Sequence, residues 1–467
     1  MKRHAKTVRA AEMLAIVITV VMFFTMLCTC GMYIDIKING QSSSLPPVPS
    51  HEKQILLKTG AAENKLYPED MIEPLIIGIK DGNKQICASF DSESRASFKN
   101  ITDGYLNELF SGTSKKISFK DDAQRRDYVE RLISSPKYVL LSYFGEIHAS
   151  AFPPCLSQSF ESPGSDMLFG VKHLFITNGE DGTAFGVSVS QNGEINELYP
   201  SRNFTIDNIS ADEYDISEGY SRFEYFGEDG IHPVYSTSFL SDKYELRTMG
   251  SIYGKSMSSY WVDNLFDIFS LNSSLVKSFS SKNDTEIIYV DDENELLLND
   301  DGKVEYVSDG EGINLEHFLG YAPNESGSYM FTDKILAVKN IVNSIKHNKD
   351  SREYSVVGID YEKHGDLLSV YLKSFVDGIA VFDSNYDAVF EIASDSLTRA
   401  SFVHLVCTRI DEYCVCLNQS YSNVLLADAE QEDLSDVTFC PVLEKEEDGD
   451  YYVPVWAKFD VYDSEVQ

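Results

Sequence analysis

Three short patterns in the sequence contain residue types that could form a nucleophilic centre. Ser274-Leu-Val-Lys277 has the Ser-x-x-Lys spacing in which a Lys amine activates a Ser hydroxyl for acyl transfer. Tyr421-Ser-Asn423 and Lys58-Thr-Gly60 resemble the second and third elements that accompany such a pair. The Lys-Thr-Gly element should come last along the chain, but here it comes first. The three patterns therefore do not predict a catalytic site.

The stretch Asp383-Ser-Asn385-Tyr-Asp387 opens like a calcium loop, in which alternating residues supply oxygen ligands. The sixth position is Ala388, where the sharp turn needs Gly, and the twelfth is Ser394, where a bidentate Glu is needed. A polar hairpin turn is therefore the better interpretation. The nine His are scattered, without zinc-ligand spacing, and no phosphate loop or dinucleotide fingerprint occurs. We expect a protein that is not an enzyme and binds no cofactor or metal.

Eight Cys leave two interpretations open. Two of them lie in the apolar N-terminal run, at Cys28 and Cys30. In an oxidising exterior the four nearest the C-terminus are candidates for disulfides: Cys407, Cys414, Cys416 and Cys440. However, Cys414 and Cys416 are two apart on a predicted strand and point the same way, which is poor geometry for bonding each other. Buried free thiols are the alternative.

The charge balance excludes one class of partner. The 467 residues contain 39 Lys+Arg against 74 Asp+Glu, a formal net charge of -35. Such a chain repels nucleic acid and anionic lipid. With 43% hydrophobic residues the chain can nevertheless bury sizeable cores. We therefore expect a folded, acidic protein that does not bind nucleic acid.

The N-terminal region is typical of a membrane anchor. The run from Met13 to Met32 contains no charge and is long enough to cross a bilayer core of roughly 30 Å. It is too long for a cleavable signal peptide, and no Ala-x-Ala site follows it. A lipoprotein signal at Cys28 or Cys30 is an alternative, but Thr29 is a poor residue before a modified Cys. We expect a retained anchor helix over residues 13–33.

Basic residues in the first twelve positions predict that this end lies in the cytoplasm. The rest of the chain would then be extracytoplasmic, in a cell membrane crossed once. Up to Tyr33 the formal charge is +3, which leaves -38 for the exported part. Residues 1–12 are the predicted cytoplasmic tail, and residues 34–65 form a polar, Pro-rich juxtamembrane linker.

The exported part predicts antiparallel sheets with a few helices, an α+β class. An N-terminal α+β domain over 66–240 contains the amphipathic helix that ends before Gly112 and the buried strand from Lys137 to Phe144. A middle unit over 241–325 reads as a helix followed by a hairpin whose turn ends at Gly302. A C-terminal α+β domain over 326–467 opens with a helix, whose apolar face is Ile335, Val338, Ile341, Val342 and Ile345.

Three stretches carry a resemblance to a known family. They are 135–147, then 264–272 with 288–290 and 301–306, and finally 371–382, which contains a Tyr…Asp-Gly…Val-Phe hairpin. Together they resemble the YycH/YycI regulators of Gram-positive bacteria, which are single-pass proteins with an uncleaved anchor and an extracytoplasmic α+β body. The Cys-x-Cys pair departs from that pattern, and the chain after Asp428 matches loosely.

The resemblance implies a regulator that binds and modulates the membrane sensor histidine kinase of the YycFG (WalKR) two-component system, which controls cell-wall metabolism. A second YycH/YycI-type protein is a further implied partner. The anchor helix would pack against the kinase through adaptable side chains, for which the candidates are Met22, Phe23, Phe24, Thr25 and Met26. The alternative function is an anchored extracytoplasmic protein that binds a cell-wall fragment or peptide.

Overall fold

The computed structural model describes fourteen segments of the chain between residues 71 and 460. These are 71–88, 92–155, 169–214, 221–226, 232–235, 239–248, 259–280, 286–291, 293–323, 327–347, 349–362, 366–417, 437–446 and 451–460. The predicted tail, anchor helix and linker lie outside the described residues. None of the helices that the structure describes is long and apolar enough to cross a membrane.

The first of two sheets has nine strands and is called here the N-terminal sheet. Its described pairs are antiparallel. In spatial order the strands are β3 (Thr113–Ile117), β7 (Ile195–Tyr199), β6 (Ala184–Val189), β5 (Gly170–Asn178), β4 (Lys137–His148), β1 (Ile76–Asp81), β2 (Lys84–Cys87), β8 (Ser221–Phe226) and β9 (His232–Tyr235).

The second sheet has fourteen strands and is called the C-terminal sheet. Its main path runs β11 (Lys277–Ser280), β12 (Glu286–Asp291), β13 (Asn294–Asn299), β14 (Lys303–Ser308), β20 (Ser396–Val403), β19 (Ala388–Ala393), β17 (Leu367–Val376), β18 (Ile379–Ala380), β22 (Val437–Lys445), β23 (Tyr452–Asp460), β10 (Phe239–Thr248) and β21 (Leu405–Leu417). Two further strands pair at its side, β15 (Ile313–Asn314) with β20 and β16 (Glu353–Glu362) with β17. Strands of the predicted middle and C-terminal units thus share one sheet, and the predicted domain boundaries stay predictions.

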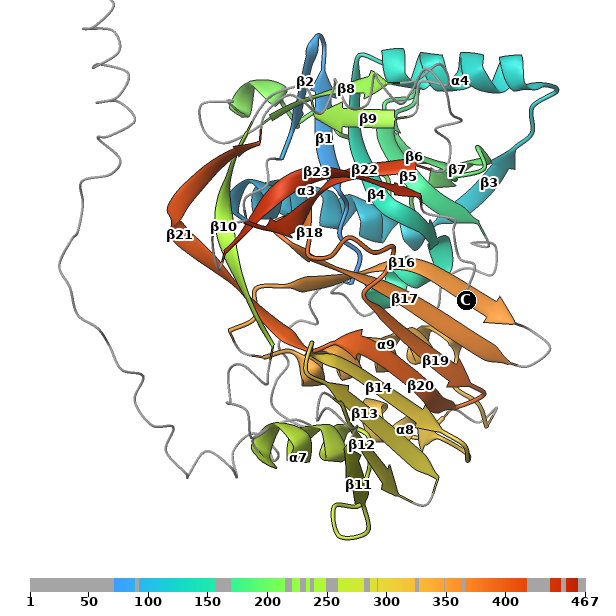
Figure 1. Cartoon of the computed structure of the whole chain (residues 1–467). Coiled ribbons are helices and arrows are strands. Elements are labelled where there is room, and N and C mark those ends of the chain that lie inside the picture. Colours follow the sequence, from blue (N-terminus) through green and yellow to red (C-terminus); the bar gives the residue numbers. More distant parts are fainter. Residues whose placement is uncertain are drawn as a thin grey trace, which may run out of the picture. The chain divides into compact units, whose positions relative to one another are not determined.

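Few helices accompany these sheets, so the protein is α+β and mostly sheet. They are α3 (Ser92–Phe110), α4 (Asp122–Ser134), α5 (Phe152–Cys155), α7 (Ser259–Ile268), α8 (Glu316–Leu319) and α9 (Phe331–Ile345), with short 3₁₀ turns η2 (Ala149–Ala151) and η3 (Ala211–Glu213). Figure 1 shows α7, α8 and α9 alongside the C-terminal sheet and α3 and α4 alongside the N-terminal sheet.

Local sequence explains the two best-defined helices. The Asp121 carboxylate caps α4 by accepting from the backbone N–H of Gln124 at 2.9 Å, and Pro136 prevents continuation of the helix. In α9 the Asp333 carboxylate accepts from the backbone N–H of Met330 at 3.0 Å. The predicted apolar face of α9 is buried along its whole length, which confirms the periodicity.

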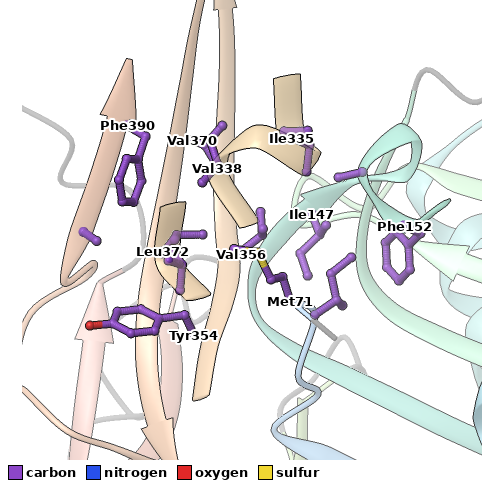
Figure 2. Packing of buried hydrophobic residues seen from close by; sticks show 14 of the residues in the cluster. Met71, Ile147, Phe152, Ile335, Val338, Tyr354, Val356, Val370, Leu372 and Phe390 are labelled. Atoms are coloured by element: carbon purple, nitrogen blue, oxygen red, sulfur yellow. The ribbon is translucent and has the colours of Figure 1, made fainter. Parts of the chain in front are cut away.

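One apolar core joins the two sheets. Figure 2 shows Ile335 and Val338 of α9 between side chains of the C-terminal sheet, such as Val370, and Ile147 of the N-terminal sheet. The backbone N–H of Val356 on β16 donates to the carbonyl oxygen of Met71 at 2.8 Å. By its contacts, Lys65–Gln467 is one compact unit.

Candidate functional site

The most unusual polar feature of the described residues is a set of buried cations where β4 and β5 meet β17 and β22. We call this set the buried seam and define it by Phe144, Lys172, Lys373, Asp387, Thr438, Cys440 and Phe459. In Figure 1, β22 crosses beside β4, and these two strands are in contact. A charge placed there is removed from water, so it must find partners inside the protein.

Lys172 connects both sheets. From β5, its buried amine donates hydrogen bonds to the carbonyl oxygen of Phe144 on β4 and to the hydroxyl of Thr438 on β22. The Thr438 hydroxyl lies 2.8 Å from the same carbonyl oxygen, to which it donates. Three strands therefore meet at one hydrogen-bonded triangle, which spans 294 residues of the chain.

Lys373 forms the second part of the seam. Its Nζ lies 3.3 Å from Asp387 Oδ1 and donates to the carbonyl oxygens of Phe382 at 2.7 Å and Ser384 at 2.5 Å. The same amine lies 5.5 Å from the ring centre of Phe144 and 5.2 Å from that of Phe459. Cation–π attraction in a desolvated position adds to the ion pair.

Besides the ion pair, the carboxylate of Asp387 accepts hydrogen bonds from two neighbouring serines. It accepts from the Ser374 backbone N–H at 2.7 Å, the Ser374 hydroxyl at 2.5 Å and the Ser384 hydroxyl at 2.6 Å. Asp387 is the fifth residue of the calcium-like stretch. In the structure its carboxylate pairs with Lys373. Across the residues that the structure describes, no three His, Cys, Asp or Glu side chains gather as a metal site.

Burial changes the chemistry of the amine and thiol at the seam in opposite senses. It lowers the pKa of Lys172 to about 7, because the ammonium form is the one that loses hydration. It raises the pKa of Cys440 to about 12, although the nearby amines of Lys373 and Lys172 oppose this shift. Cys440 is thus a protonated, unreactive thiol at neutral pH. The seam can hold two sheets together and can exchange a proton at Lys172, but it presents no thiolate nucleophile.

A second polar cluster ties the start of the described chain to both α3 and the C-terminal sheet. The Glu73 carboxylate accepts from Arg95 Nη2 at 2.6 Å and from Lys99 Nζ at 3.1 Å, and its backbone N–H donates to the Ser355 hydroxyl at 2.9 Å. Burial acts to raise the pKa of Glu73, but the charges of Lys99 and Arg95 outweigh it and lower the pKa. Burial and the Glu73 charge raise the pKa of Glu353 nearby.

A third cluster fixes the start of β21 to the segment that follows α9. The buried Arg352 guanidinium pairs with Asp350 at 2.7 Å and donates to the carbonyl oxygen of Leu405 at 2.6 Å. Asp350 also accepts from the backbone N–H of Cys407 at 3.0 Å. His404 accepts from the Trp261 indole N–H, and its Nε2 lies 2.8 Å from the Ile345 carbonyl oxygen. Burial lowers the pKa of His404 to about 3, so the ring is a neutral structural link.

The structure describes the side chains of four residues that the Ser-x-x-Lys motif and the Cys pattern singled out as candidates. Ser274 donates its hydroxyl to Asn272 Oδ1 at 2.6 Å, and Lys277 is exposed on β11. Cys407 and Cys440 are free, buried thiols, and they lie in two different core clusters. These two positions therefore carry no disulfide in the structure.

The remaining predicted site residues are outside the described side chains. Met22, Phe23, Phe24, Thr25 and Met26 precede the first described residue, and nothing is described of the Cys414 and Cys416 side chains. A shallow hollow along α4 is lined by Gln124, Asp127, Glu130, Arg131 and Ser134, a set without a nucleophile paired to a base.

Motif spacing does not predict the seam, because its residues lie far apart in the chain. A signal existed nevertheless. Lys172 lies inside the run GVKHLFITN and Lys373 inside SVYLKSFV, each a single Lys within a strand that is otherwise buried. A cation in such a strand must be paired or hydrogen bonded. The sequence does not say with which partner.

These features define an α+β protein of two joined, mainly antiparallel sheets. No protein-family model matches the chain, and no curated protein matches it. Among solved structures, YycH from Bacillus subtilis is similar in fold, with a TM-score of 0.52 and 15% identity over 83% of this chain and 93% of that chain. An uncharacterised protein from Eubacterium rectale aligns with a TM-score of 0.30 and 13% identity over 47% of this chain and 77% of that one, which carries no inference. The chain therefore has a YycH-like fold.

Proposed function

We propose that this protein is a membrane-anchored, extracytoplasmic regulator that binds and modulates the sensor histidine kinase of a two-component system controlling cell-wall metabolism. The observation that carries the proposal is the YycH-like fold, which covers 83% of the chain. The motifs in 135–147, in 264–272 with 288–290 and 301–306, and in 371–382 also support it, since they resemble the same family. The partners are the kinase and a second YycH/YycI-type protein.

The proposed mechanism is coupling through the anchor. A ligand or partner that prefers one arrangement of the exported body shifts the packing of the anchor against the kinase helices, since a shift requires differential affinity. The described polar clusters suit a rigid body that transmits such a shift, because they connect strands that are distant in sequence. The proposal includes a cytoplasmic N-terminus, a single crossing over 13–33 and no enzymatic activity.

The decisive experiment is purification of the full chain from detergent-solubilised membranes, followed by identification of the co-purified proteins. We expect a sensor histidine kinase in stoichiometric amount. The kinase is then reconstituted in proteoliposomes with and without the full chain, and its autophosphorylation rate is measured. Failure to recover a kinase, together with an unchanged autophosphorylation rate, would contradict the proposal.

The anchor is tested by substitution within the predicted helix. The double variant Phe23→Ala/Phe24→Ala should weaken kinase recovery at least fivefold, because close packing and not hydrophobicity drives helix association in lipid. The matched control Ile16→Ala/Ile18→Ala removes apolar volume from the same helix outside the candidate segment and should leave recovery within twofold. Equal losses in both variants would show that the Met22–Met26 segment is not specific.

The alternative, a binding protein for a cell-wall fragment, requires a concave cleft lined by aromatic side chains. The hollow along α4 has polar and charged lining residues and no aromatic one. That hollow therefore does not favour the alternative.

A further inference from the structure

The strand β11 ends the C-terminal sheet, and within the described residues it pairs with β12 alone. All four of its residues are exposed. A terminal strand leaves backbone N–H and C=O groups unpaired along one side, where another extended chain can add. Figure 1 shows β11 at the lower end of this sheet, beyond β12 and beside α7.

We call α7 with β11–β15 the acidic arm. One face of its sheet is covered by α7, where Phe266 packs against Tyr289 and Phe269 stacks on Tyr306. The register of the strands shows which residues share the other face, since it aligns Phe279 with Ile288 and Ile288 with Leu297 across three strands.

This second face carries apolar side chains beside Glu295, Lys303 and Glu305, and several of the apolar ones are open to solvent. Phe279 is 56% exposed and Val307 is 40% exposed, while Leu275, just before β11, is 57% exposed. Three of the seven large hydrophobic side chains that are exposed in the described residues thus belong to the acidic arm. Clustering of this kind marks interaction surfaces, whereas single exposed hydrophobic residues are ordinary.

The charge of the acidic arm specifies the partner. Its described residues within 259–314 include two basic side chains, Lys277 and Lys303. They include eleven acidic ones: Asp263, Asp267, Glu286, Asp291, Glu293, Glu295, Asp300, Asp301, Glu305, Asp309 and Glu311. A second copy of the arm would bring the same excess of negative charge, so self-pairing at this edge is repulsive. A cationic segment is attracted.

Two other terminal strands carry stronger protective features than β11. On the N-terminal sheet, β3 has adjacent Lys115 and Lys116, and β9 contains Pro233. Lys and Pro on edge strands are the devices by which proteins prevent unwanted strand addition. Across its four residues β11 has one Lys and no Pro, and it presents Phe279 to solvent.

We propose that β11 and the open face beside it form a docking site for an extended, basic segment of a partner protein, which adds to the sheet as a further strand. Main-chain pairing with β11 supplies the alignment, and alternate apolar side chains of the segment pack beside Phe279, which extends the row of Phe279, Ile288 and Leu297 by one strand. The basic side chains of the segment are attracted by the excess of carboxylates on the arm. This proposal does not rest on the proposed kinase partner.

The test uses the full chain in detergent and three fluorescently labelled ten-residue peptides. The probe alternates Lys with Val. One control replaces each Val by Pro, which keeps the charge but removes strand pairing, and the other replaces each Lys by Glu. We expect anisotropy to report binding of the Lys–Val peptide, at least tenfold weaker binding of Lys–Pro, and none of Glu–Val. Raising the salt concentration from 0.05 M to 0.5 M should weaken binding, as screening requires.

Site-directed variants locate the binding. Phe279→Arg should weaken the Lys–Val peptide at least tenfold, whereas Tyr386→Arg, at an aromatic residue 39% exposed outside the arm, should stay within twofold. Glu295→Lys/Glu305→Lys should weaken binding similarly, and Asp127→Lys/Glu130→Lys on α4 should not. Hydrogen exchange should slow at the backbone amides of 277–280 when the Lys–Val peptide is bound.

The proposal is overturned if Lys–Pro binds as well as Lys–Val, because the attraction is then merely electrostatic. Slowed exchange confined to residues outside the acidic arm, or equal binding by the Phe279→Arg and Tyr386→Arg variants, would contradict it as well. Circular dichroism of each variant shows whether it is folded, and Phe279→Ser is the second variant if Phe279→Arg is not.

Discussion

The buried seam and the acidic arm use charge in opposite ways. At the seam, Lys373 is neutralised by Asp387 and Lys172 is held by uncharged acceptors, all inside the protein. The described residues of the arm include eleven carboxylates and only two basic side chains, and some of its apolar side chains are exposed. Charge that is satisfied internally fixes the relation of two sheets, whereas uncompensated charge at a sheet edge is available to a partner. The comparison predicts that mutations at the seam change stability and mutations on the arm change binding.

The largest expected effect is at the Lys373–Asp387 pair. Asp387→Ala leaves a buried ammonium without its counter-charge and should lower the free energy of unfolding by about 3–5 kcal/mol. The control Lys373→Met/Asp387→Asn removes both charges but keeps an oxygen acceptor for the Ser374 and Ser384 donors, so it should cost much less. Urea denaturation measures both variants. Equal losses would show that the ion pair itself is not the source of the effect.

The second effect is a pH dependence that comes from Lys172. Its pKa in the folded state, about 7, is lower than the usual 10.5, so the unfolded chain holds a proton that the folded chain lacks between these values. Stability contributed by this residue therefore rises as the pH increases from 7 toward 10.5, by up to about 1.4 kcal/mol per pH unit.

Lys172→Met removes this dependence. The variant should be more stable than the native chain near pH 7, since the cost of the buried ammonium is gone, and the difference should shrink at pH 9 to 10. Phe144 keeps the hydrogen bond from Thr438, so the variant leaves no orphaned carbonyl. Denaturation at several pH values tests the expectation. A constant difference between the two proteins would mean that Lys172 does not titrate in this range.

A smaller effect is expected at Thr438, whose hydroxyl links Lys172 to Phe144. Thr438→Val keeps the shape but leaves one acceptor missing for the buried amine, which should cost about 1–3 kcal/mol. Thr398→Val, at a partly buried threonine on β20 whose hydroxyl donates to the Glu391 carbonyl oxygen, is the matched control and should cost less. The reverse order would show that the seam is not specially dependent on its hydrogen bonds.

The smallest effect on stability should come from the arm. Phe279→Ser removes a side chain that is 56% exposed and should change the free energy of unfolding by within about 0.5 kcal/mol. Phe144→Ala, at a fully buried ring of the seam, should cost about 3–5 kcal/mol and is the reference. A loss above 2 kcal/mol for Phe279→Ser would show that the open face stabilises the fold. The arm would then resemble the seam in its effect on stability.

Local patterns predicted the elements well where one segment carries all the information. The strand expected from Lys137 to Phe144 is the buried first part of β4, and the helix with Ile335, Val338 and Ile341 on one face is α9. The hairpin with its turn at 299–302 is β13 and β14, with Gly302 at a φ of +86°. Each follows from periodicity or a turn residue, which act over a few positions.

The residues of the seam could not be assembled in the same way. A lone Lys in a buried strand signals that a partner exists, but Thr438 lies 266 residues from Lys172. The calcium-like stretch 383–387 and the Ser-x-x-Lys stretch 274–277, neither of which predicts a site, have the same limit, since each motif describes residue types and spacing without the tertiary surroundings. Once folded, Asp387 faces Lys373, and Ser274 bonds Asn272.

The sequence by itself determined the composition, the strong acidity, the period of each helix and strand, and the apolar run that predicts an anchor. These depend on residues near one another in the chain. Tertiary structure alone decided which strands meet: that β22 lies beside β4, that β14 pairs with β20, and that β11 is left at an edge. The physical reason is that sheet order is set by long-range pairing and shared burial, where the free energy depends on residues hundreds of positions apart. The same long-range pairing makes Lys172 and Lys373 a buried joint between the sheets and leaves Phe279 in solvent.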